Sequence, residues 1–193
     1  MEEQQITIGD QSLALPKPFL VMATQNPVEQ EGTYPLPEAQ VDRFMLKVTV
    51  DFPRRSEESA IIDRMTAPAP PEAKSILSPE QIMDLQGMVP HVYMDDRVKN
   101  YILDMVFATR EPKTMGLENF IETGVSPRAS LALVKASRAH ALIEGRAFVT
   151  PDDVKALVHE VFRHRILLTY ESLAEGWTAD RVIDAIIDKV EVP

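Results

Sequence analysis

The first third of the chain alternates short apolar stretches with turn residues, a pattern that predicts strands and short helices. Residues 5–8 and 12–15 alternate apolar and polar side chains on either side of Gly9-Asp10, which predicts a β-hairpin. Two further strands and two helices are expected, the strands over 19–23 and 44–50 and the helices over 38–43 and 54–65. The first of these strands is expected to be buried, because all of its residues are apolar.

The rest of the chain carries the start signals and apolar spacing of helices. Three prolines within residues 66–71 predict a semi-rigid linker. Ser78 and Pro79 then begin a helix, and Gln81 completes a capping box. Further helices are expected over 95–109, from Ser126 to Gly145, from Thr150 to about Arg163 and over 178–190.

These elements predict two parts of different fold class. Residues 1–65 are expected to form an α/β unit with a hairpin, two strands and short helices. Residues 66–77 are the proline-rich linker, and residues 78–193 are an all-α domain. A chain of 193 residues is long enough to bury a core of its own.

Composition narrows the kinds of partner. The formal charge of −10 argues against general nucleic-acid binding, because phosphate contacts need lysine and arginine. The basic residues instead gather in a few places, such as Arg163-His164-Arg165, which suits local anion contacts. There is no cysteine, no apolar run of membrane-spanning length and no signal-peptide pattern at the start, so we expect a cytoplasmic protein that is not bound to a membrane.

Asn26 is the first candidate site residue. It follows the predicted strand over 19–23, and open α/β sheets bind ligands at the carboxyl ends of their strands. Its amide could orient a water against a terminal phosphate. The alternative is that Asn26-Pro27 only starts a turn.

Arg43 is the second candidate. It lies at the end of a predicted short helix between Asp42 and Phe44, so its guanidinium would leave the fold at a fixed point. A guanidinium held in this way can stabilise charge on a transferring phosphoryl group. The alternative is a surface salt bridge with Asp42 or Glu38, which would contribute little.

Arg128 is the third candidate, and its position is unusual. It occupies the first turn of the helix that begins at Ser126-Pro127, where a cation opposes the helix dipole. An anion docked there would interact with the free N–H groups, the dipole and the guanidinium together. The alternative is an arginine whose aliphatic stem packs on the neighbouring sheet.

Other chemistry is poorly supported by the sequence. His159 and His164 are five residues apart, so they do not share a helix face as the two histidines of HExxH do, and no metal site is predicted. The sequence also contains no GxxxxGK[ST] phosphate-binding loop and no strand ending in a convincing pair of magnesium-binding acids.

Three stretches, taken together, resemble the MoxR-type AAA+ ATPases. They are ATQNP at 23–27, EGTYPLPEAQVDRF at 31–44 and GVSPRASLALVKASRAHALIEGRAFVTPDDV at 124–154. The likeness in order and spacing extends from about Met1 to Arg165. It implies the C-terminal part of an AAA+ P-loop core followed by the helical lid, with the hairpin resembling the insertion hairpin before sensor 1.

The resemblance also assigns roles to the three candidates. It implies that Asn26 is the sensor-1 residue, that Arg43 is an arginine finger acting in trans, and that Arg128 is the sensor-2 residue. The Walker A and Walker B segments of the family are not in this chain, so we expect the chain alone to be inactive and to bind no nucleotide. ATP and Mg²⁺ would be used by the full-length protein.

Family likeness further implies a homo-oligomer, expected to be a ring of six, that couples ATP hydrolysis to chaperone-like maturation of a client protein complex. It also implies a von Willebrand factor A-type protein as a candidate partner. One alternative is an ATP-independent helical module that binds a partner protein. Another is a DNA-translocating AAA+ motor, which the hairpin does not favour because residues 5–13 contain no cation.

Overall fold

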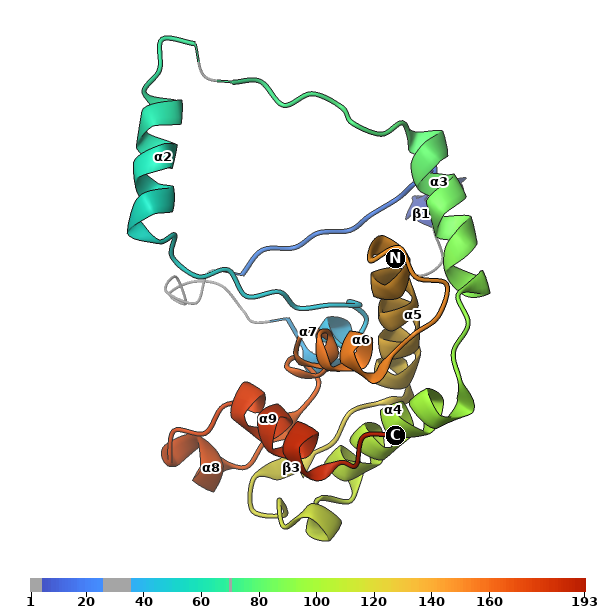
Figure 1. Ribbon diagram of the computed structural model, residues 1–193, viewed down its shortest axis with the longest axis vertical. Helices are drawn as coiled ribbons and strands as arrows, with labels where there is room; N and C mark the ends of the chain where they lie inside the picture. The colour runs from blue at the N-terminus through green and yellow to red at the C-terminus, as the bar shows by residue number, and fades with distance from the viewer. Residues whose placement is uncertain (1–4, 26–35, 70) are drawn as a thin grey trace.

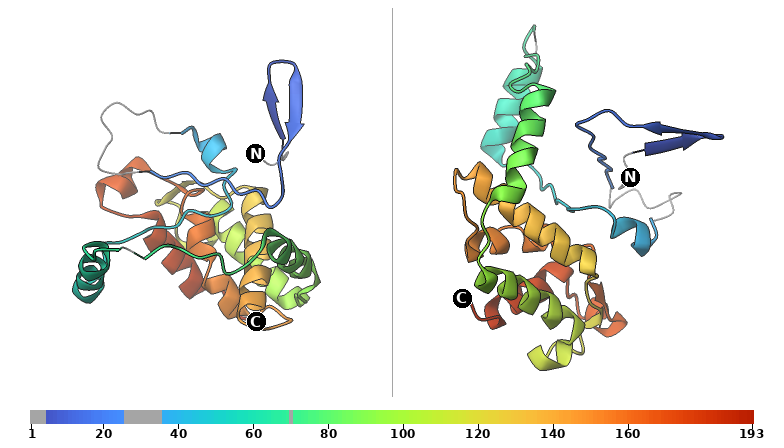
Figure 2. Two further views of the ribbon diagram at one scale, coloured as in Figure 1. Left: turned by 90° about the horizontal axis from the view of Figure 1, so that it is seen from above. Right: turned by 90° about the vertical axis from the view of Figure 1, so that its right-hand side faces the viewer.

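The computed structural model describes residues 5–25, 36–69 and 71–193 (Figure 1). The predicted hairpin is confirmed, with β1 (Gln5–Ile8) antiparallel to β2 (Gln11–Ala14). Gly9 has φ of 62°, a conformation that the tight turn requires and that glycine adopts without strain. Figure 2 shows the hairpin projecting from the helical part of the molecule.

The two strands expected over 19–23 and 44–50 are not formed, and the prediction that the first is buried is wrong. Both segments run extended without a ladder partner among the described residues. Leu20 and Met22 are about four-fifths exposed, at 79% and 80%, and Val50 is 91% exposed. The physical reason is that a strand is defined by its pairing, and no described segment supplies the neighbouring strand.

The two helices of the first part are formed close to their predicted bounds. They are α1 (Glu38–Val41) and α2 (Arg55–Met65). In Figure 1, α2 lies apart from the helical cluster that contains α4, α5 and α7. The division of the chain at 1–65, 66–77 and 78–193 stays a prediction.

The helical part follows the local start signals of the sequence. Its elements are α3 (Pro79–Met88), the 3₁₀ turn η1 (Val89–His91), α4 (Asp96–Arg110), α5 (Pro127–Ile143), α6 (Pro151–Lys155), α7 (Val158–Phe162) and α9 (Ala179–Lys189). Ser78 and Gln81 form the predicted capping box, with the Ser78 amide donating to Gln81 Oε1 at 2.8 Å. Asp95 and Ser126 cap α4 and α5 through their side chains.

Some features of this part were not predicted. The helix expected from Thr150 to Arg163 is broken into α6 and α7 at residues 156–157. No element was predicted between the helices expected over 95–109 and from Ser126, but the structure has the 3₁₀ turn η2 (Pro112–Met115) and the strand β3 (Ile121–Thr123) there. β3 pairs antiparallel with β4 (Leu167–Leu168), and α8 (Tyr170–Ala174) follows β4 along the chain. These strands are two or three residues long, too short to show a period in the sequence.

The start of α5 is fixed against the end of α4 by a close backbone approach. A Cβ at Gly124 would lie 2.4 Å from the carbonyl oxygen of Thr109, so only glycine fits there. The next amide, of Val125, donates to Thr109 Oγ1 at 3.1 Å. This contact places Ser126 and the first turn of α5.

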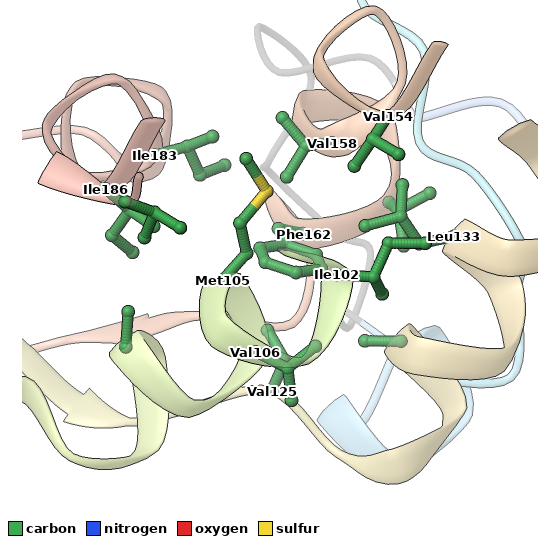
Figure 3. Packing of buried hydrophobic residues seen from close by; sticks show 14 of the residues in the cluster. Ile102, Met105, Val106, Val125, Leu133, Val154, Val158, Phe162, Ile183 and Ile186 are labelled. Atoms are coloured by element: carbon green, nitrogen blue, oxygen red, sulfur yellow. The ribbon is translucent and has the colours of Figure 1, made fainter. Parts of the chain in front are cut away.

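The hydrophobic core lies among α4, α5, α6, α7 and α9. Figure 3 shows Met105 from α4, Leu133 from α5, Phe162 from α7 and Ile183 from α9 converging on one centre. All four are fully buried. The core therefore holds α7 and the residues that follow it in a fixed position relative to α5, and both of these elements contribute to the site.

One buried carboxylate joins α5 to α6. Asp153 accepts hydrogen bonds from Arg146 at 2.5 and 2.7 Å, from the Thr150 amide at 2.7 Å, and shares one with His140 at 2.6 Å. Burial alone would raise the pKa of Asp153, but these partners outweigh it and hold the pKa well below its usual value. The buried acid is thus fully paired and serves the fold.

Candidate functional site

Asn26, the predicted sensor-1 residue, lies outside the described residues. The chain is described up to Gln25 and again from Leu36. Its proposed role therefore depends on the sequence resemblance alone.

Arg43 follows α1 directly. The chain closes α1 with two turn hydrogen bonds, from the Arg43 amide to the Gln40 carbonyl at 3.3 Å and from the Phe44 amide to the Val41 carbonyl at 3.0 Å. Phe44 is partly buried, whereas Arg43 is exposed. The Arg43 side chain thus lies at the surface, on a turn that is held by these two hydrogen bonds and by the partly buried Phe44.

Arg128 lies in the first turn of α5, as the sequence predicted. Its amide donates to the capping Ser126 Oγ at 3.2 Å. Its guanidinium approaches the Asp42 carboxylate, with Nη1 3.4 Å from Oδ2, and the side chain is 47% exposed. Arg128 therefore contacts a carboxylate of this chain, that of Asp42, the residue before Arg43.

Asp42 is the centre of the site. Its carboxylate accepts from Ser126 Oγ at 3.0 Å, from Arg165 Nε at 2.9 Å and from Arg128 at 3.4 Å. Burial would raise the pKa of Asp42, but the hydrogen bonds from Ser126 and Arg165 and the charge of Arg165 outweigh it and lower the pKa. Asp42 is thus ionised and brings the turn that carries Arg43 to the first turn of α5, where Arg128 lies.

Sequence reasoning missed the roles of Asp42 and Arg165. The sequence predicted Asp42 only as a salt-bridge partner of Arg43 at the surface. It predicted Arg165 only as part of the basic run 163–165, with local anion contacts. The two residues are 123 positions apart, so no local pattern could pair them. The signal that was present is the basic run Arg163-His164-Arg165 in an acidic chain.

Two of the histidines are hydrogen-bonded to other groups of the chain. His159 Nε2 pairs with Asp184 Oδ1 at 2.9 Å, and His164 Nε2 donates to the Phe44 carbonyl at 3.1 Å. Within the described parts of the chain, no group of three or more His, Asp or Glu side chains could hold a metal ion. Over the same residues, no helix is long and apolar enough to cross a membrane.

His164 gives the site a pH dependence. Burial and the charge of Arg165 lower its pKa from 6.5 to about 4. The Nε2–H group of His164 donates to the Phe44 carbonyl, and Nδ1 is buried with no hydrogen-bond partner among the described residues. A second proton, bound at Nδ1, would therefore have no acceptor. Lys47 also disfavours the charged form, and only the backbone carbonyl of Phe44 and Asp42 favour it.

We therefore expect the chain to lose stability as pH falls from 6.5 towards 4, because over this window the unfolded state binds a proton at His164 that the folded state does not. The expected loss is about 2 kcal/mol, measured by urea unfolding at a series of pH values. His164→Gln should flatten the dependence. Asp42 and Asp153 act at lower pH, since their lowered pKa values affect stability only below about 3.8. Parallel losses in wild type and variant would contradict this account.

Comparison with known proteins identifies the fold. Residues 1–46 match the family described as "ATPase family associated with various cellular activities (AAA)", and residues 116–186 match "AAA lid domain". A solved structure from Cytophaga hutchinsonii, described as a candidate ATPase, superposes with a TM-score of 0.93 at 39% identity, covering all of this chain and 59% of that one. The chain thus has an AAA+ fold, and its α/β and lid parts are confirmed.

The curated relatives are more specific. Chaperone MoxR1 of Mycobacterium tuberculosis is 43% identical over the whole chain, and protein MoxR of Paracoccus denitrificans is 32% identical over 90% of it. Protein YeaC of Bacillus subtilis is 40% identical over the whole chain. Over its described length the chain is similar to MoxR-type AAA+ proteins, in agreement with the sequence resemblance. It spans 52% to 59% of the length of MoxR1, MoxR and YeaC.

Proposed function

We propose that this chain forms the sensor, arginine-finger and lid part of a MoxR-type ATPase that couples ATP hydrolysis to remodelling of a protein complex. The observation that carries the proposal is the Asp42 contact with Arg128, which brings the residue next to Arg43 to the first turn of α5. Sequence segments that lie 86 positions apart meet there. The match to MoxR-type relatives supports the same assignment.

The residues present fit the outer part of a triphosphate site. The first turn of the 17-residue helix α5 and the Arg128 guanidinium are suited to hold phosphate oxygens of the subunit's own nucleotide, and the exposed Arg43 presents a guanidinium to the site of the adjacent subunit. The phosphate-binding loop is absent from this sequence. We therefore assign the cradle for ATP and the ligands of Mg²⁺ to a further segment, and we call the polypeptide that carries both parts the complete ATPase.

Each candidate residue has a separate role in this proposal. Asn26 orients the attacking water through its amide. Arg43 stabilises negative charge in the site of the adjacent subunit, so that turnover requires assembly. Arg128 binds the terminal phosphate and transmits its presence to the lid. Bound ATP with Mg²⁺ supplies the phosphoryl group whose transfer these residues assist.

The assembly and the setting are part of the same proposal. An arginine finger that acts in trans requires a neighbouring subunit, and we propose a ring of six subunits in the cytoplasm. MoxR1 carries the name of a chaperone, which supports a protein client for this chain. A von Willebrand factor A-type partner remains a prediction from the resemblance. The comparisons do not favour an ATP-independent module or a DNA motor.

Arg128→Ala in the complete ATPase tests the assignment. We expect kcat/KM for ATP to fall about 10²-fold, because a preorganised cation on the phosphates is lost. Arg97→Ala is the matched control, since Arg97 also lies in the first turn of a helix and pairs with a carboxylate, that of Asp95 at 3.0 Å. The control should leave steady-state turnover unchanged. Normal turnover in Arg128→Ala would favour the interaction module, with its arginines as surface residues.

A further inference from the structure

The basic run Arg163-His164-Arg165 has no part in the proposed function so far, yet all three residues bind the chain that carries Arg43. Arg163 Nη1 donates to the Lys47 carbonyl at 2.8 Å, and His164 Nε2 donates to the Phe44 carbonyl at 3.1 Å. The Lys47 amide returns a bond to the Glu160 carbonyl at 2.8 Å. Residues 160–164, at the end of α7 and just after it, thus contact Phe44 and Lys47 of the segment 42–47.

Arg165 makes the densest of these contacts. Its Nε donates to Asp42 Oδ1 at 2.9 Å, and its Nη2 donates to the carbonyls of Asp42 and Phe44 at 3.0 and 2.5 Å. Its Nη1 reaches the Met45 carbonyl at 3.3 Å and also the Val161 carbonyl in α7. The Arg165 side chain is 2% exposed. Because its donors lie in one rigid plane, this set of bonds fixes both position and direction.

The other end of this connection is anchored in the lid core. Val161 and Phe162, which precede the basic run, are fully buried. Arg163 Nε also donates to Asp180 Oδ1 at 2.9 Å, which ties the run to α9. The segment 42–47 is therefore bonded to the packed helices of the lid.

Arg43 lies between the two residues that Arg165 holds. The carbonyls of Asp42 and Phe44 are both bound by the same nitrogen of Arg165, while the Arg43 side chain is exposed. The backbone of Arg43 consequently cannot shift without breaking buried, charge-assisted hydrogen bonds.

We propose that Arg165, with Arg163 and His164, is a positioning residue for Arg43 and makes the arginine finger move with the lid. The inference rests on the proposed function of Arg43. A finger must meet the transferring phosphoryl group in a narrow geometry, and a displacement of about 1 Å can lower a rate about 10²-fold. The cluster thus connects the lid of one subunit to the proposed catalytic contact with its neighbour.

The test uses Arg165→Met in the complete ATPase, measured beside Arg43→Ala and the double variant. We expect kcat to fall about 10²-fold in Arg165→Met, with KM for ATP changed less than about twofold, because the subunit's own phosphate contacts are kept. The double variant should turn over as slowly as Arg43→Ala alone, since Arg165 acts through Arg43. Arg181→Met is the matched control: Arg181 lies over the Trp177 ring in the lid.

A purely structural role for Arg165 predicts different results. It would lower ATP affinity along with kcat, and its effect would add to that of Arg43→Ala. Either additive loss in the double variant or unchanged kcat in Arg165→Met would overturn the inference. Full turnover in Arg43→Ala would contradict the proposed function of Arg43, on which the inference depends. Reduced turnover in Arg43→Ala with unchanged kcat in Arg165→Met would contradict only the positioning role of Arg165.

A milder variant covers the case in which Arg165→Met does not fold, as judged by thermal unfolding. Arg163→Gln removes the bonds of the guanidinium to the Lys47 carbonyl and to Asp180, and leaves Arg165 in place. We expect kcat to fall about 10-fold with KM unchanged, and faster hydrogen exchange at the Lys47 amide. The inference would be contradicted if a folded Arg163→Gln protein had wild-type kcat although its Lys47 amide exchanged hydrogen faster than in the wild type.

Discussion

Replacing Arg43 by alanine in the complete ATPase is expected to lower kcat about 10³-fold while ATP binding stays close to normal. The reason is that Arg43 is exposed on the surface of its own subunit, and in the proposed ring it acts on the nucleotide of the neighbour. The measurement is steady-state phosphate release, together with the dissociation constant of a nucleotide analogue.

Arg64→Ala is the matched control, because Arg64 is also an exposed arginine near the end of a helix of the α/β part. It should retain wild-type turnover. Mixing wild-type subunits with Arg43→Ala subunits gives a second test. Activity should fall as the share of variant rises, since each variant subunit disables a site in its neighbour. Full turnover in pure Arg43→Ala would eliminate the finger assignment.

Phe162→Ala is expected to destabilise the lid by about 3–5 kcal/mol, enough to unfold much of a marginally stable domain. Phe162 is fully buried at the point where α4, α5 and α7 meet, and it directly precedes the basic run (Figure 3). Its loss leaves a cavity that the surrounding aliphatic side chains cannot fill without moving. Urea unfolding of the chain measures the effect.

Phe52→Ala is the control for this change, because Phe52 is 99% exposed in the same structure. It should alter the free energy of unfolding by less than about 0.5 kcal/mol. Equal effects of the two substitutions would show that the helices around Phe162 do not form the stabilising core.

The parts of the fold that the sequence predicts well are those with local causes. Ser78 and Ser126 begin helices because their side chains accept from backbone amides two or three residues ahead, and that chemistry is visible in a few consecutive residues. The helix 179–189 was similarly predicted by its regular apolar spacing.

The parts that were predicted wrongly or missed depend on distant residues. Residues 19–23 have the composition of a strand, but a strand forms only when a neighbour supplies its hydrogen bonds. The connection between Asp42 and Arg165 spans 123 positions and was not predicted. The three candidate roles came from family resemblance, because asparagine or arginine at a single position has several ordinary uses.

The most direct test is a structure of the complete ATPase ring with a non-hydrolysable ATP analogue. We predict that the Arg43 guanidinium lies about 3 Å from a γ-phosphate oxygen in the adjacent subunit, with Asn26 beside the same phosphate in its own subunit. An Arg43 side chain enclosed within its own subunit, or an Asn26 distant from every nucleotide, would contradict the account.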